Sequence, residues 1–155
     1  MLTDGDKAPE FSLQDDNGNT VTLSGLKGRR IILYFYPKDD TPGCTKEACD
    51  LKDRSKEVKK LNAVVLGVSP DSVESHQKFK TKFGLPFQLL ADPGSKVCQL
   101  YGVWKEKSMY GRTYMGVERT TFLIDEKGKI ARIFPKVKVE GHADELLAQL
   151  SSIPA

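Results

Sequence analysis

Hydrophobic positions along the chain follow two different periods. Residues 31–36 and 63–68 are apolar runs rich in β-branched and aromatic side chains, as expected of strands that are buried on both faces. Between them, from about residue 42 to residue 61, apolar residues recur at helical spacing with charged residues in between. This order of strand, helix and strand predicts a parallel sheet with a crossover helix.

The N-terminal segment predicts a β-hairpin. Residues 11–14 and 21–23 each alternate between apolar and polar side chains, and the segment that joins them contains an Asn-Gly pair. This combination is a strong local signal for two antiparallel strands. We expect the hairpin to lie at an edge of the sheet.

The rest of the chain predicts further helices and a second pair of strands. A capping-box-like start at residues 71–74 opens a helix that ends near Gly84. The other expected elements are a strand at 88–90, a short helix at 95–101, a loop at 102–116, strands at 120–124 and 129–134, and a helix at 142–150. The order β-α-β followed by β-β-α predicts an α/β protein with a thioredoxin-like fold, a central mixed sheet flanked by helices.

Composition and charge exclude several classes of function. The 155 residues are 39% hydrophobic and 29% charged, which is enough for a buried core, so we expect one domain over residues 1–155. The formal net charge is +3, and the basic and acidic residues are interspersed. Nucleic acid is therefore not an expected partner. Neither a secretory start nor an apolar run of membrane length is present, which predicts a cytoplasmic protein with no membrane partner.

The cysteine count directs attention to individual thiols. The chain has three cysteines, Cys44, Cys49 and Cys98. This number is odd and too small for the disulfide framework of a secreted protein. In open α/β sheets the chemistry lies just beyond the carboxyl end of a central strand, and here that place is the segment 37–44. Cys44 is therefore the first candidate for a chemical role.

Cys44 is expected in the first turn of the helix that begins near residue 42. If Thr41 is the N-cap and Pro42 the first helical residue, the thiol lies among free backbone N–H groups, where a thiolate is favoured. The Pro-Gly-Cys turn is expected to leave the sulfur exposed, so that it can attack a peroxide, a disulfide or a carbonyl. The alternatives are that Cys44 is only a small buried residue and that Thr41 only caps the helix.

These residues resemble a known family. The pattern Pro37-x-x-x-Thr41-x-x-Cys44 resembles the peroxidatic motif of the peroxiredoxins, and the string from Thr41 to Cys49 resembles the peroxiredoxin Q subfamily, also called bacterioferritin comigratory protein. The resemblance continues through most of the chain, in the segments 67–71, 89–92, 101–104 and 119–125.

The resemblance implies reduction of hydroperoxides, including hydrogen peroxide and organic hydroperoxides, with no cofactor and no metal. It implies that Cys44 is the peroxidatic cysteine and Cys49 the resolving cysteine, which form an intramolecular disulfide. Thr41 would orient the peroxide, Pro37 would shield the sulfur, and Arg119 would be the active-site arginine. Thioredoxin or a similar dithiol is the expected reductant.

Helix geometry sets a condition on this disulfide. Residues five apart in an ideal helix have Cα atoms roughly 8 to 9 Å apart, whereas a disulfide needs less than about 7 Å. Resolution by Cys49 should therefore require local unwinding of the helix. Because the resolving cysteine lies in the same helix as Cys44, no second subunit is needed, and we expect a monomer.

Other residues have less specific interpretations. Cys98 departs from the family pattern and is interpreted as a packing residue or a spare thiol. We expect His76 on a helix surface and His142 at a helix start, with no metal-ligand spacing to a cysteine pair. Trp104 and Tyr110 are interpreted as core residues of a loop, or as contacts for a reductant.

Three other classes of protein share some of these features. A thioredoxin-like disulfide reductase would need Cys-x-x-Cys, which the spacing of Cys44 and Cys49 does not give. A cysteine phosphatase would need an arginine six positions after the nucleophile, where Asp50 stands. A non-catalytic thioredoxin-fold module with packing cysteines stays open, and loss of two thiols within seconds of peroxide addition would exclude it.

Overall fold

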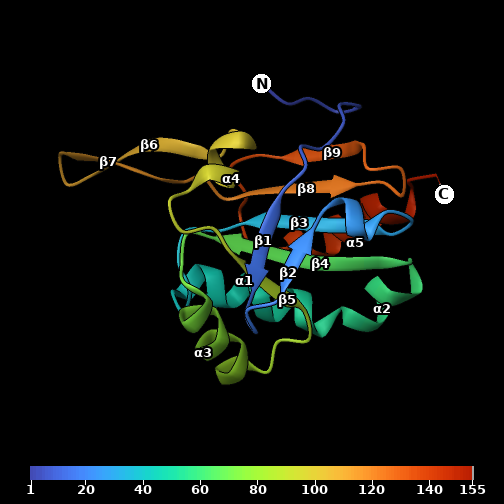
Figure 1. The fold of residues 1–155 in the computed structure, drawn as a ribbon, viewed down its shortest axis with the longest axis horizontal. Coiled ribbons are helices and arrows are strands. Elements are labelled where there is room, and N and C mark those ends of the chain that lie inside the picture. The colour runs from blue at the N-terminus through green and yellow to red at the C-terminus, as the bar shows by residue number, and fades with distance from the viewer. Residues whose placement is uncertain (155) are drawn as a thin grey trace.

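The central sheet is mixed. In the computed structural model, which describes residues 1–154, seven strands pair in the order β2-β1-β5-β4-β3-β8-β9 (Figure 1). β3, β4 and β5 run parallel, and β1, β8 and β9 are each antiparallel to a neighbour. The predicted fold class is confirmed. The strands are β1 (Ser12–Asp15), β2 (Thr20–Thr22), β3 (Arg30–Phe35), β4 (Ala63–Ser69), β5 (Gln88–Ala91), β8 (Thr120–Ile124) and β9 (Ile130–Phe134). Ala155, the last residue of the predicted domain, lies outside the described residues.

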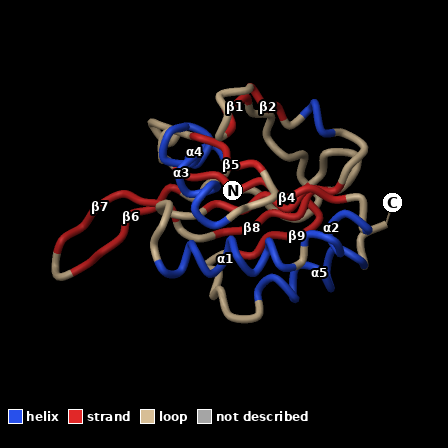
Figure 2. The backbone as a smooth tube through the Cα atoms, turned by 90° about the horizontal axis from the view of Figure 1, so that it is seen from below, coloured by secondary structure: helices blue, strands red, loops and turns tan. Residues whose placement is uncertain are grey.

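Helices cover both faces of this sheet. α1 and α5 lie along the same face, and α4 lies on the other (Figure 2). The helices are α1 (Pro42–Asp53), α2 (Ser55–Lys60), α3 (Val73–Phe83), α4 (Lys96–Leu100) and α5 (His142–Ser151), with a 3-10 turn at Ser24–Leu26. Within residues 1–154, no helix has both the length and the apolar character needed to cross a bilayer.

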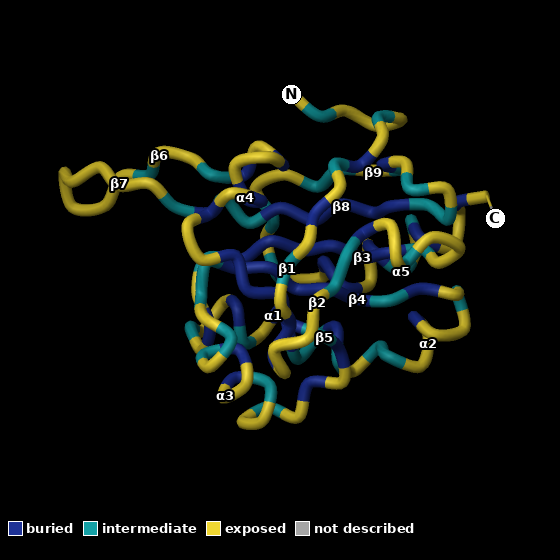
Figure 3. Tube along the Cα trace, in the orientation of Figure 1, coloured by how far each residue is buried: buried dark blue, intermediate teal, exposed yellow. Residues whose placement is uncertain are grey.

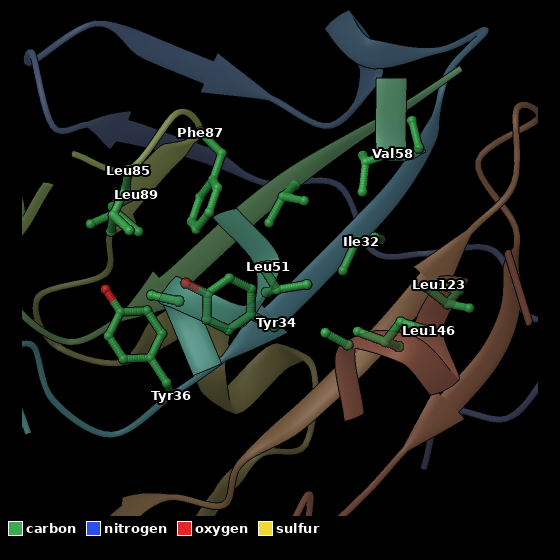
Figure 4. Close-up of a cluster of buried hydrophobic side chains, with 14 of the residues drawn as sticks. Ile32, Tyr34, Tyr36, Leu51, Val58, Leu85, Phe87, Leu89, Leu123 and Leu146 are labelled. Carbon is green, nitrogen blue, oxygen red and sulfur yellow. The ribbon is translucent and has the colours of Figure 1, made fainter. Parts of the chain in front are cut away.

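β3 is buried on both faces because its side chains alternate between two cores. Ile32 and Tyr34 pack in a cluster with side chains from α1 and α5 (Figure 4). Leu33 and Phe35 pack in a second cluster on the opposite face, with side chains from α4. Figure 3 shows that β3 and β8 are buried along most of their length. The predicted central strand is confirmed, and its carboxyl end leads to the candidate site.

The predicted N-terminal hairpin is also confirmed. β1 and β2 pair antiparallel, and β1 also pairs with β5, so the hairpin extends one edge of the sheet. Asp15 Oδ1 accepts hydrogen bonds from the backbone N–H groups of Asn17 and Asn19, both at 2.9 Å, and Gly18 has a left-handed φ of 80°. These contacts fix the turn that the Asn-Gly pair predicts.

The helix predicted from about residue 42 to residue 61 forms with one break. α1 ends at Asp53 and α2 begins at Ser55, because Arg54 between them has a non-helical backbone (φ −110°, ψ 16°). The Arg54 side chain stabilises the junction, since it donates to the Asp50 carbonyl at 2.8 Å and to Asp144 of α5 at 2.6 Å. The break lies beyond both cysteines, which share α1.

Residues 104–117 form a hairpin rather than the predicted loop. β6 (Trp104–Met109) and β7 (Arg112–Val117) pair antiparallel and project from the body of the molecule (Figure 1). Tyr110 and Gly111 between them both have positive φ, 52° and 75°, as in a type I′ turn. Tyr110 is 98% exposed, so its interpretation as a core residue is wrong, whereas Trp104 packs half-buried against the second cluster.

Candidate active site

The loop after β3 leads directly into α1 and places Cys44 in the first helical turn. Thr41 takes the N-cap position with an extended backbone (φ −99°, ψ 154°), and Pro42 is the first helical residue. Proline suits this position because it lacks an N–H group that would have no partner there. The predicted start of the helix is confirmed.

The Thr41 side chain does not cap the helix. Its hydroxyl donates to the carbonyl oxygen of Lys38 at 2.9 Å, and it makes no hydrogen bond to an N–H group of the first turn. The interpretation of Thr41 as a helix cap therefore holds for its backbone position and is wrong for its side chain. Thr41 and Pro37 are both half-buried and lie at the two ends of the loop.

Cys44 is buried, which corrects the expectation of an exposed sulfur. The residue is 2% exposed and packs in the same cluster as Tyr34 and Ala48. The Pro-Gly-Cys turn exposes only its first two residues. The sulfur itself is covered by a side chain from a distant part of the chain, which the local sequence could not reveal.

That side chain is Arg119, which lies between β7 and β8. Its Nη2 donates to Cys44 Sγ at 3.2 Å, although the two residues are 75 positions apart. Its Nη1 donates to Glu47 Oε1 at 2.6 Å. One guanidinium thus joins the sulfur and a carboxylate one helical turn further along α1, and its planar fork suits two parallel contacts of this kind.

Gly43 gives this guanidinium its room. A Cβ atom at position 43 would lie 3.2 Å from Arg119 Nη2, which is tighter than an ordinary contact. A side chain at position 43 would therefore push the guanidinium away from its present place beside α1.

Glu47 is a site residue that the sequence analysis missed. It is 2% exposed, and its Oε2 has no hydrogen-bond partner among residues 1–154. Burial raises the pKa of Glu47 to about 7, although the charge of Arg119 lowers it. Burial lowers the pKa of Arg119, but Glu47 and Cys44 raise it by more. The signal for Glu47 was its spacing of three residues from Cys44, which puts both on one face of α1.

The other two cysteines differ in their surroundings. Cys49 is half-buried in the unbroken α1, and all three cysteines are free thiols. Cys98 is fully buried in the second cluster, which agrees with its interpretation as a packing residue. Burial, followed by the nearby Asp92, raises the pKa of the Cys98 thiol far above its ordinary value. Cys98 is therefore poorly suited to act as a nucleophile.

Both histidines are buried, and the prediction for His76 is wrong. His76 in α3 has no exposed surface, and its ring nitrogens lie 2.7 Å from Asp39 Oδ2 and 2.9 Å from the Leu90 carbonyl oxygen. Asp39 belongs to the loop before Cys44, so His76 contacts the site region rather than solvent. His142 starts α5 as predicted, and its Nε2 lies 2.9 Å from Thr121 Oγ1.

The comparisons with known proteins agree on one family. Residues 5–133 match the model of the AhpC/TSA family. Peroxiredoxin Bcp of Bacillus subtilis is 52% identical over 96% of this chain and 95% of its own length. Among solved structures, peroxiredoxin Q of Xanthomonas campestris is 44% identical with a TM-score of 0.88, over 92% of this chain and 90% of that one. A cysteine variant of Xylella fastidiosa PrxQ is 38% identical with a TM-score of 0.93, over 98% and 97% of the two chains.

The family match shows that the chain belongs to the AhpC/TSA family. Together with the fold, the relatives and the cysteine that an arginine contacts at a helix start, it defines the class of the protein as a thiol-dependent peroxidase, a peroxiredoxin. Within that class, its relatives are the Bcp and peroxiredoxin Q proteins, so the subfamily that the cysteine motif indicated is confirmed. A further structure of the Xanthomonas campestris bacterioferritin comigratory protein is described by its alkyl peroxide reduction activity and a trapped intermediate.

Proposed function

We propose that Cys44 is the peroxidatic residue of this peroxidase and that Arg119 activates it. The observation that carries the proposal is the 3.2 Å contact from Arg119 Nη2 to Cys44 Sγ. A guanidinium at this distance stabilises a thiolate, and burial of the sulfur strengthens the attraction because water is excluded.

In the first step, the Cys44 thiolate attacks the terminal oxygen of a hydroperoxide. The S–O bond forms while the O–O bond breaks, so Cys44 becomes a sulfenic acid and the leaving oxygen takes a proton to give water or an alcohol. Arg119 and the N–H groups at the start of α1 stabilise the negative charge that moves to the leaving oxygen. Thr41 orients the peroxide, and Pro37 shields the sulfur.

In the second step, Cys49 attacks the Cys44 sulfur and displaces water. The product is an intramolecular disulfide, and its formation needs α1 to open between the two residues because the helix holds them apart. A dithiol, which we propose is thioredoxin, then reduces the disulfide by thiol exchange. The relative described by its alkyl peroxide reduction supports organic hydroperoxides as substrates beside hydrogen peroxide.

The same proposal describes the chain as one domain that acts as a cytoplasmic monomer. It needs no partner subunit, because both cysteines lie in α1. The strands before and after the site share one sheet, which supports a single domain.

The test is a count of thiols. The reduced protein is mixed with one equivalent of hydrogen peroxide, the reaction is quenched after seconds, and free thiols are titrated. We expect two of the three thiols to be lost, with Cys98 unchanged. A protein that keeps all three would contradict the role of Cys44.

A further inference from the structure

The loop between β3 and α1 is held at its middle by Asp39. This residue is 7% exposed, and its carboxylate accepts hydrogen bonds from the Tyr36 hydroxyl at 2.5 Å and the Ser75 hydroxyl at 2.7 Å. Its backbone N–H donates to Asp71 Oδ2 at 2.8 Å. Both the main chain and the side chain of one loop residue are thus fixed to the rest of the protein.

His76 makes a further buried contact with Asp39. Its Nδ1 lies 2.7 Å from Asp39 Oδ2, and its Nε2 lies 2.9 Å from the carbonyl oxygen of Leu90 in β5. The ring is fully buried. It therefore bridges the loop to the central sheet, with one nitrogen for each.

The hydrogen-bond chemistry of the ring makes both contacts directional. A carbonyl oxygen only accepts, so Nε2 carries a proton. The Asp39 carboxyl group already accepts hydrogen bonds from two hydroxyl groups. Its third hydrogen bond, to His76 Nδ1, has its proton either on the ring nitrogen or on the carboxyl oxygen. In each case a short hydrogen bond without water joins His76 to the loop.

α3 provides a firm support for this ring. The Ser72 hydroxyl caps the helix by accepting from the Ser75 N–H at 3.1 Å, and Gly84 ends the helix in the left-handed conformation. Phe79, which follows His76 on the same face, packs near Tyr36 with ring centroids 6.4 Å apart. The position of the imidazole is therefore set by the helix rather than by the loop.

The same residues could suggest a cation site, but the hydrogen bonds explain them. Ligand atoms of Asp39, Asp71 and His76 lie within 4.8 Å of one another. Oδ2 of Asp39 accepts from Ser75, and Oδ2 of Asp71 accepts from Ser69 at 2.6 Å and from the loop backbone. These oxygens are already bonded to protein donors, so the cluster connects elements of the fold.

We infer that His76 is a positioning residue for the peroxide step, acting through Asp39. By fixing the middle of the loop, it holds Pro37 and Thr41 at the two ends where a peroxide would bind over Cys44. This inference rests on the proposed function of Cys44. His76 itself contacts neither the sulfur nor the peroxide.

Two isosteric variants separate loop positioning from simple stabilisation of the fold. The amide nitrogen in His76→Asn can take the place of Nδ1 and keep the bond to Asp39, while the bond to Leu90 is lost. The amide nitrogen in His76→Gln can take the place of Nε2 and keep the bond to Leu90, while the bond to Asp39 is lost. Each variant removes one of the two short buried hydrogen bonds of the ring, and His76→Gln also loses the longer contact of 3.4 Å between Nδ1 and the Tyr36 hydroxyl.

The measurement is the second-order rate constant for oxidation of Cys44 by hydrogen peroxide in a single turnover, together with urea unfolding of each variant. We expect His76→Asn to stay within about 3-fold of wild type and His76→Gln to be about 10- to 100-fold slower, as for small displacements of positioning groups. Equal rates in the two variants, or a slower His76→Asn, would overturn the inference.

Ser75→Ala is a second variant with little risk to folding. It removes one hydroxyl donor to Asp39 from the surface of α3, and we expect a rate about 2- to 5-fold below wild type. An unchanged rate would count against the inference even if neither histidine variant folds. Rapid oxidation of wild-type Cys44 supports the proposed function in every case, so failure of the positioning role is distinguishable from failure of the peroxidase assignment.

Discussion

Glu47 Oε1 and Arg119 Nη1 lie 2.6 Å apart, and this buried ion pair joins the helix that carries Cys44 and Cys49 to the residue before β8. Glu47 stands between the two cysteines along α1. We therefore expect an opening of the helix that brings the cysteines together to carry Glu47 out of the core and separate it from Arg119. In the proposed mechanism, this pair would couple the peroxide step to the opening of α1.

Burial of Glu47 predicts a pH dependence of disulfide formation. Folded Glu47 has a pKa of about 7, and an exposed glutamate carboxyl group has an ordinary pKa of 4.5. Between these values the folded helix holds a proton that the open helix releases, so folded α1 loses stability as pH rises, by up to about 3 kcal/mol. We expect disulfide formation from the sulfenic acid to become faster as pH rises from about 4.5 to about 7. Above that range, ionisation of Glu47 should not accelerate it further.

Glu47→Gln provides the control for this measurement. The amide keeps the shape of the side chain and does not titrate, so the resolution rate of this variant should rise less steeply between about pH 5 and 7 than that of wild type. Rapid-quench mass spectrometry of sulfenic acid and disulfide follows the step directly. Identical pH profiles in the two proteins would show that Glu47 does not govern the opening.

The two cysteines of α1 should have different roles in turnover. Cys44→Ser is expected to abolish peroxidase turnover, whereas Cys49→Ser should react once with peroxide and stop at the sulfenic acid, because only Cys44 performs the nucleophilic step. Excess peroxide should then convert that acid to sulfinic acid, which intact mass detects. A fully active Cys44→Ser enzyme would refute the assignment.

Oxidation should melt the start of α1. A Cys44–Cys49 disulfide cannot form in an intact helix of this geometry, so amides of residues 44–52 should exchange faster in the oxidised protein than in the reduced one. Peptide mapping identifies the bond, and the amides of β4 serve as the internal control. Equal protection of α1 in both states would contradict the mechanism even if the protein reduces peroxide.

Arg119 should act on both the thiolate and the transition state. Arg119→Ala is expected to lower the thiolate fraction of Cys44 at neutral pH, since the charged form loses an attractive partner. Oxidation of Cys44 by peroxide in this variant should remain ~10²-fold or more slower than in wild type even at a pH where Cys44 is fully ionised, because a preorganised donor is lost. Arg119→Lys keeps the charge without the fork, so it should restore thiolate absorbance better than the rate. Wild-type rates in Arg119→Ala would remove this residue from the site.

Elements with continuous or periodic apolar patterns could be predicted from the sequence. β3 and β4 were identified because their side chains are buried on both faces, and the N-terminal hairpin because its turn has a specific chemistry. The hairpin of β6 and β7 could not be found in this way, since it projects from the body and most of its side chains are exposed, so no alternation marks it.

Prediction of the site had a similar limit. The start of α1 follows from Thr41 and Pro42, which are local signals, but the contact between Cys44 and Arg119 spans 75 positions and was available only through family resemblance. His76 was misplaced because its sequence neighbours are polar or charged. Its spacing of three residues from the buried Phe79 was the signal that it faces inward.

The unbroken course of α1 from Pro42 to Asp53 also has a consequence for the survival of the enzyme under oxidative stress. In the mechanism proposed above, a sulfenic acid on Cys44 has no thiol partner while the helix stays closed and is open to a second peroxide molecule. The frequency of helix opening therefore determines the peroxide concentration above which the enzyme is inactivated faster than it recovers. A mutation that stabilises the second turn of α1 lowers that concentration, and one that loosens it raises tolerance, without any change in the residues that contact the substrate.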